Sequence, residues 1–96
     1  MLDQLTFEAF QPHVNQTFRV DLADSAGVDL VLTECSAFAH AGQGRQQFHL
    51  IFVGPMQPVL PQRIYPLVHQ QMGTLNIFLV PIGPNAEGMR YEAIFT

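Results

Sequence analysis

Residues 73–95 constrain the fold of this chain more than any other segment, because they contain two apolar runs joined by a turn. Residues 75–80 are apolar at every second position and again at Phe78 and Val80. A strand that is apolar on both faces needs cover on both, so this run is predicted to be the central strand. Residues 89–95 alternate and predict a second strand. The turn between the runs contains Pro84, Asn85, Glu87 and Gly88.

The remaining segments also have the spacing of short strands. Residues 17–22, 28–35, 46–53 and 64–69 are predicted strands, with an irregularity near Thr33 where the apolar alternation breaks. Before them, residues 6–14 form a predicted helix that Thr6 caps and that packs on the sheet by one apolar stripe. Short connections favour antiparallel neighbours. The predicted fold is all-β, a mostly antiparallel six-stranded small sandwich or partly open barrel with one short N-terminal helix.

Strand parity predicts which side chains are buried. The inward set, on which Phe7 and Phe10 of the helix pack, is Phe18, Val20, Leu22, Leu30, Leu32, Phe48, Leu50, Phe52, Tyr65, Leu67, Leu75, Ile77, Leu79, Tyr91 and Phe95.

Length and charge limit the classes of function. The 96 residues are expected to form a single domain, residues 1–96. The chain has no lysine, only four Arg against eight Asp and Glu, and a net charge of −4. Nucleic acids and anionic membrane surfaces bind clustered basic residues, so neither is an expected partner. No apolar run is long enough to span a bilayer, and there is no secretory signal pattern. Together with the single Cys35, this favours the cytoplasm.

The side chains that could perform chemistry are dispersed. His13, His40, His49 and His69 lie in four different segments without the spacing of metal ligands. Cys35 follows Glu34, whose charge would raise a thiol pKa. We therefore expect no catalytic residues, no metal site, no cofactor and no enzymatic activity.

Three prolines recur at every third position in the segment before the predicted fourth strand: Pro55, Pro58 and Pro61. In a polyproline II helix they would lie on one side. The segment has two interpretations, a stiff strap with Leu60 tucked into the core or a docking ridge for a partner.

The predicted interaction surface joins this segment to the strand at residues 64–69. Pro66 within that strand cannot donate a ladder hydrogen bond, which favours a sheet edge. The predicted surface residues are Met56, Val59, Ile64, Pro66 and Val68. The leading hypothesis is a non-enzymatic structural or interaction module, a homo-oligomer or a docking site for a protein partner. The alternative is a small barrel that binds an apolar ligand near Tyr65, His69 and Tyr91.

Several segments, taken in order, resemble a family of small bacterial proteins described only as a domain of unknown function. The segments that resemble this family are residues 5–14, 17–18, 48–55, 60–69, 73, 78–84 and 91–95. The resemblance implies an accessory or structural role beside phage-tail-collar-like proteins, and it implies no catalytic residue. This chain departs from similar sequences around Tyr65, where charged positions are replaced by Ile64, Pro66 and Val68.

Overall fold

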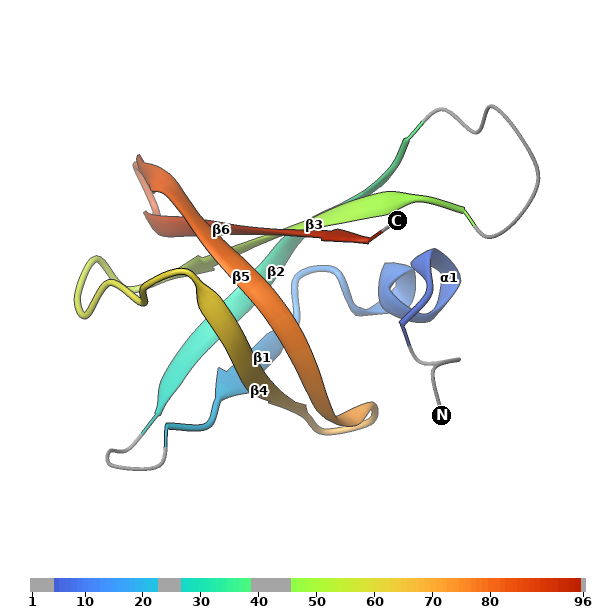
Figure 1. Cartoon of the computed structure of the whole chain (residues 1–96), viewed down its shortest axis with the longest axis horizontal. Helices are drawn as coiled ribbons and strands as arrows, with labels where there is room; N and C mark the ends of the chain where they lie inside the picture. Colours follow the sequence, from blue (N-terminus) through green and yellow to red (C-terminus); the bar gives the residue numbers. More distant parts are fainter. Residues whose placement is uncertain (1–4, 23–26, 39–45, 96) are drawn as a thin grey trace.

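The computed structural model describes residues 5–22, 27–38 and 46–95, which form six antiparallel strands and a short helical segment. The strands close into a barrel in the order β1-β2-β3-β6-β5-β4, with the helical segment at one end (Figure 1). The elements are α1 (Phe7–Phe10), the 3-10 turn η2 (Gln11–His13), β1 (Thr17–Val20), β2 (Val28–Ala37), β3 (Phe48–Gly54), β4 (Arg63–His69), β5 (Gly73–Asn85) and β6 (Gly88–Phe95).

The all-β class, the number of strands and their antiparallel pairing are confirmed, but the prediction that residues 64–69 form a sheet edge is wrong. β4 pairs with β5 along its length and also with β1, where Val20 lies opposite Leu67. Pro66 lacks an N–H, but its carbonyl accepts a hydrogen bond from the Asp21 N–H at 2.9 Å. Proline is tolerated here because this position uses only its carbonyl.

The side chains that point into the barrel fill it, as strand parity predicts. Most of the predicted inward residues are buried, and Tyr91 and Phe52 are among the largest that are fully enclosed. Leu22 and Phe95 are instead only partly buried against the core. Leu22 lies two residues beyond the end of β1 and Phe95 is the last residue of β6, so each has fewer neighbours than a residue in mid-strand.

The helical segment closes one end of the barrel with an aromatic cluster. Thr6 caps α1, because its Oγ1 accepts a hydrogen bond from the Ala9 N–H at 3.1 Å. Pro12 lies in η2, where the α-helix has already ended, so the helix is shorter than predicted. Phe10 is fully buried, with its ring centroid 5.8 Å from that of Phe95. Figure 1 shows β5 and β6 diverging toward this end, and the β5–β6 ladder stops at Val80 and Glu92.

Two local irregularities agree with the sequence. The β2–β3 register shifts between Leu32 and Glu34, which confirms the irregularity expected near Thr33. The hairpin between β5 and β6 turns on Asn85, whose Oδ1 accepts hydrogen bonds from the N–H groups of Glu87 and Gly88. Any Cβ at Gly88 would collide with the carbonyl oxygen of Gly54, so the turn packs against the end of β3.

The prediction that residues 75–80 are covered on both faces is wrong. Leu75, Ile77 and Leu79 point into the core, but Phe78 is 48% exposed and Val80 only half-buried. In a barrel, only one face of each strand is turned inward, so the interior cannot cover the second face. The apolar outer face of β5 is therefore a surface feature.

Candidate interaction surface

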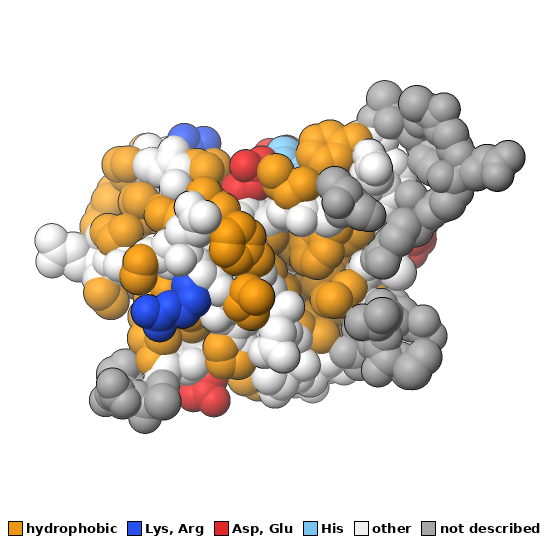
Figure 2. All heavy atoms as spheres, in the orientation of Figure 1, with side chains coloured by type: hydrophobic (Ala, Val, Ile, Leu, Met, Phe, Trp, Pro, Cys, Tyr) orange, Lys and Arg blue, Asp and Glu red, His pale blue; other side chains and the backbone are white. Residues whose placement is uncertain are grey.

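The five residues predicted for an interaction surface are on the outside of the barrel, though not all equally. Ile64 is 60% exposed on β4, and Val68 is exposed farther along the same strand. Pro66, between them, is half-buried. Met56 and Val59 are exposed in the segment between β3 and β4. Figure 2 shows hydrophobic side chains gathered over the left part of the molecule, where Figure 1 places this segment and the adjoining ends of β4, β5 and β6.

The strand register shows where the apolar surface is continuous. Ile64 lies directly opposite Phe78 on β5, which is also exposed. Pro66 and Val68 lie opposite Asn76 and Thr74, which are polar. The apolar surface therefore extends from Ile64 toward β5, and not along β4 toward Val68.

The apolar face of β5 ends at β6. Val80, two residues beyond Phe78, pairs with Glu92, and the β5–β6 ladder stops at this pair. Ile94 is 56% exposed, but it lies beyond this point, opposite His49 on β3. We name Ile64, Phe78 and Val80 the outer apolar face. Sequence reasoning missed Phe78. The available signal was the second apolar parity of residues 75–80, which was interpreted as a buried face.

The proline segment is anchored through Leu60. The Leu60 side chain is buried in the core, and its N–H donates to the Tyr91 hydroxyl at 2.9 Å. The Tyr65 hydroxyl donates to the Pro61 carbonyl at 2.6 Å. The chain bends at residues 56–58, so the three prolines do not follow one straight polyproline helix. This supports the packed strap, with Met56 and Val59 outward.

A histidine and two carboxylates flank the outer apolar face on β3, β6 and β2. His49 Nδ1 lies 2.9 Å from Glu92 Oε2, and its Nε2 lies 3.0 Å from Glu34 Oε2. Ser36 Oγ donates to the same Glu34 oxygen at 2.9 Å, and the Phe38 ring lies 5.4 Å from the imidazole. We name Glu34, His49 and Glu92 the carboxylate–histidine cluster.

The cluster favours a charged imidazole. Both ring nitrogens face carboxylate oxygens, and only a doubly protonated ring can donate to both. The hydrogen bond to Glu92 is the main cause that raises the pKa of His49, against the opposing effect of burial. The hydrogen bond from Ser36 is the main cause that lowers the pKa of Glu34, with His49 adding to it. Two carboxylates and one imidazolium leave the cluster itself negative. Arg90, two residues before Glu92 on the same face of β6, donates to the carbonyls of Gly83 and Ile82.

His69 has the opposite environment and a structural role. It is buried, and its Nδ1 accepts hydrogen bonds from the N–H groups of Gln71 and Met72. Its Nε2 therefore holds the proton and donates to Gln16 Oε1 at 2.8 Å. Burial, with a smaller contribution from His13, lowers the pKa of His69. The neutral imidazole holds the β4–β5 turn against the residues before β1.

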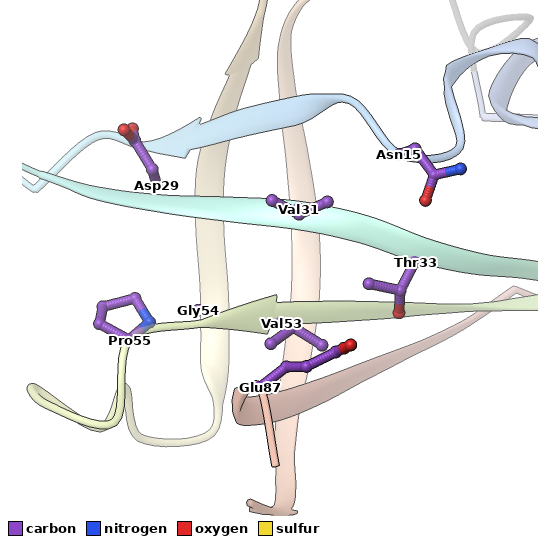
Figure 3. Close-up of a pocket in the computed structure, with 8 residues that line it drawn as sticks. All are labelled: Asn15, Asp29, Val31, Thr33, Val53, Gly54, Pro55 and Glu87. Atoms are coloured by element: carbon purple, nitrogen blue, oxygen red, sulfur yellow. The ribbon is translucent and has the colours of Figure 1, made fainter. Parts of the chain in front are cut away.

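Two hollows lie on the outside of the barrel. One, of about 450 Å³, is open and lies over β2 and β3, with Val31 and Val53 side by side and Glu87 beneath Val53 (Figure 3). A second, of about 500 Å³, has a polar lining that includes His69 and Gln16. Tyr65 and Tyr91, near which the alternative hypothesis expects an apolar ligand, are buried in the core with hydrogen-bonded hydroxyls.

The other candidate groups are dispersed. Among residues 5–22, 27–38 and 46–95, no three His, Cys, Asp or Glu side chains are arranged so that they could hold a metal ion, while His40 and Arg45 lie outside these ranges. The thiol of Cys35 is half-buried and lies 3.9 Å from the Phe7 carbonyl oxygen. Burial is the main cause that raises the pKa of Cys35, and the charge of Glu8 is the second. The sequence had suggested the charge of Glu34 instead. None of the described helices has the length and apolarity needed to cross a membrane.

Comparison with known proteins places the whole barrel in one family. The family described as domain of unknown function (DUF6916) matches residues 5–95. The chain belongs to this family. The match runs from the residue before Thr6, the cap of α1, to the last residue of β6, so the DUF6916 domain comprises all eight elements described above. No curated protein and no solved structure matches the chain significantly.

Proposed function

We propose that this DUF6916 domain is a non-enzymatic structural module that binds a protein partner through its outer apolar face. The observation that supports this most directly is the cross-strand pair of Ile64 and Phe78, both large, apolar and exposed on a closed barrel. A cross-strand apolar pair contributes at most about 1 kcal/mol to a sheet, whereas an apolar patch rimmed by polar residues is typical of a binding surface.

The site chemistry supports binding over catalysis. The raised pKa of Cys35 keeps its thiol protonated at neutral pH, which disfavours a nucleophilic role. The ring nitrogens of His49 and of His69 are engaged by protein groups, so neither imidazole offers a free nitrogen for acid–base work. The filled interior disfavours the alternative of an apolar ligand held inside the barrel.

The setting of this module extends the proposal. We propose that it is a bacterial cytoplasmic protein that is either a homo-oligomer or an accessory of a phage-tail-like assembly, as its resemblance implies. A homo-oligomer and an accessory of an assembly both need repeated contacts through one surface. Most strand edges of a closed barrel are paired, so the side chains of the apolar face would make these contacts without strand exchange.

The test is affinity capture from a bacterial lysate with matched variants. Ile64→Glu and Phe78→Glu each place a charge on the face, and both are expected to abolish capture of any protein retained by the unmodified chain. Val31→Glu is the control, because Val31 is an exposed apolar residue on the outer face of β2. Circular dichroism checks the fold of each variant. Capture that is unchanged by Ile64→Glu and Phe78→Glu would contradict the proposed surface.

A further inference from the structure

We infer that an extended segment of a protein partner adds to β5 as an extra strand, along residues 74–78 on the side that faces β6. This inference rests on the proposed function, for which it names the way in which the partner binds. The reason is that this part of β5 is paired with a neighbouring strand on one side only.

The hydrogen-bond pattern of β4 shows which way the backbone of β5 faces. The carbonyl of Pro66 accepts a hydrogen bond from the Asp21 N–H at 2.9 Å, so the backbone of Pro66 faces the β1 side and not β5. In an antiparallel ladder, residues alternate between pairs that exchange hydrogen bonds and pairs that do not. Asn76, which lies opposite Pro66, therefore turns its N–H and C=O away from β4. Thr74 and Phe78, two residues to either side, do the same.

No strand completes the ladder on the other side of this segment. β6 is the neighbour of β5 there, but the β5–β6 ladder stops at Val80 and Glu92, and the two strands then diverge (Figure 1). In the described part of the chain, the backbone hydrogen bonds outside the helices and ladders do not involve Thr74, Asn76 or Phe78. All three residues are exposed. A row of unpaired N–H and C=O groups at an accessible strand edge is a template for another strand.

Apolar side chains lie on both faces beside this edge. Phe95 has the inward parity of Tyr91 and Ala93, but it lies beyond the last β5–β6 pair and is only partly buried. Phe78 on β5 and Ile94 on β6 point outward and are 48% and 56% exposed. Figure 2 shows hydrophobic side chains set back between the regions where Figure 1 places β5 and β6. The alternate side chains of an added strand would cover both sets.

The position of the edge favours a single extended segment over a second barrel. Because β5 and β6 converge on the Val80–Glu92 pair, a strand added to this edge lies between them. A strand of a second folded copy would carry its own neighbouring strands, which would meet β6. An extended segment has no such neighbours. It would have no proline at the positions that pair with β5, a large apolar side chain beside Phe78, and polar side chains beside Thr74 and Asn76.

The first measurement is amide hydrogen exchange, followed by NMR on the full chain without a ligand. The amides of Leu75 and Ile77 face their partners Leu67 and Tyr65 on β4. They are expected to exchange at least about 100-fold more slowly than the amide of Asn76, which faces away from β4. This alternation within one strand reports directly whether the edge is free.

The second measurement uses random peptides of about eight residues, displayed and selected on the immobilised full chain. Peptides that bind are then synthesised, and their dissociation constants are measured by fluorescence anisotropy. Binding is expected to slow amide exchange at Thr74, Asn76 and Phe78, because the peptide backbone supplies the missing acceptors.

The deciding variants change Asn76. Asn76→Pro removes the N–H that faces the added strand and leaves the β4–β5 ladder intact, because proline is tolerated where its position faces away from the neighbouring strand. It should weaken peptide binding by about tenfold or more. Asn76→Thr, the matched control, changes the same side chain and keeps the N–H, so it should alter the dissociation constant by less than about threefold. Thr74→Pro and Thr74→Ser repeat the comparison if Asn76→Pro disturbs folding, which circular dichroism checks.

Each outcome decides the inference. Equal protection from exchange at Asn76 and Leu75, a selection without binding peptides, or equal effects of Asn76→Pro and Asn76→Thr overturns it. A free chain that dimerises, and that Asn76→Pro makes monomeric, overturns the assigned partner, because the edge then pairs with a second copy. Binding that Asn76→Pro weakens and Phe78→Thr does not would support strand addition and contradict the proposed apolar face. The reverse result would overturn strand addition and leave the proposed function standing.

Discussion

The hydroxyl of Tyr91 on β6 accepts a hydrogen bond from the backbone N–H of Leu60 at 2.9 Å, and this contact anchors the proline strap to the barrel. The two residues are 31 positions apart, and both are buried. A buried N–H without a partner is costly, so the hydroxyl fixes the path of the strap as well as filling the core.

Tyr91→Phe removes that acceptor and leaves the Leu60 N–H unpaired. We expect a loss of about 1–3 kcal/mol in the free energy of unfolding, measured by urea denaturation. Tyr65→Phe is the matched control, because it frees the carbonyl of Pro61 where the contact is only partly buried and water can replace it. Equal losses in the two variants would contradict the role assigned to Tyr91.

Leu79→Ala should cost about 2–5 kcal/mol of stability, because Leu79 is fully buried in the barrel and its removal leaves a cavity. The neighbouring Phe78→Ala should change the stability of the isolated chain by less than about 0.5 kcal/mol at low concentration. Thermal melting of both variants at the same concentration provides the measurement. A Leu79→Ala variant that melts with the unmodified chain would mean that β5 does not contribute the core assigned to it.

Removing residues 1–14 should expose the aromatic end of the barrel and promote aggregation. Phe10 packs on Phe18, Phe48 and Phe95, so its loss uncovers rings contributed by three strands. Phe10→Leu, which keeps most of the apolar volume, should remain soluble. Size-exclusion chromatography and binding of an apolar dye distinguish the two. A truncated chain that stays soluble and equally stable would show that α1 does not protect this end.

His69 predicts a loss of stability in acid. Its pKa in the folded chain is lower than the value of about 6.5 for an unfolded histidine. The folded state therefore binds fewer protons in this range, and stability decreases as the pH falls below that value. Protonation would place an N–H at Nδ1 against the N–H groups of Gln71 and Met72. Urea midpoints measured between about pH 8 and pH 5 should fall, and His69→Gln should flatten this dependence.

His49 predicts the opposite dependence. Its folded pKa is raised, so its contribution is complete below the unfolded value and is lost as the pH rises through the folded pKa. The pKa of Glu34 is lowered, so the contribution of Glu34 is lost as the pH falls through that folded pKa. The cluster is therefore most stabilising above the unfolded pKa of a glutamate and below the unfolded pKa of a histidine. His49→Gln should reduce the loss of stability above neutral pH. It should not change the loss of stability in acid that depends on His69. An identical alkaline profile in both proteins would contradict this assignment.

Local chemistry in the sequence determined much of the fold. Alternating apolar residues predict the strands, since successive side chains of a strand point to opposite faces. The cap at Thr6, the irregularity near Thr33 and the turn at Asn85 each depend on atoms within a few residues of chain. For the same reason, most of the buried set was predictable, with Leu22 less buried because it lies beyond the end of β1 and Phe95 because it ends β6.

The interaction surface could be predicted only in part. Ile64, Met56 and Val59 are exposed as expected, because the strap and the outward parity of β4 are visible in the sequence. Phe78 was assigned to a covered face, because parity shows that a strand has two apolar faces but not which of them water reaches. The approach of His49 to Glu34 and Glu92 depends on β3 lying between β2 and β6, and the sequence does not specify that order.

The sequence by itself thus determined which residues form strands, where they bend and which side chains turn inward, because those properties depend on neighbouring atoms of the chain. Only the tertiary structure decided that β1 and β4 meet and close the barrel, so that Pro66 lies within a paired strand. It also left Ile64 and Phe78 opposite each other on the outside of the barrel. These relationships depend on strand order and register between distant segments, which are set by the packing of the whole core and not by any local pattern.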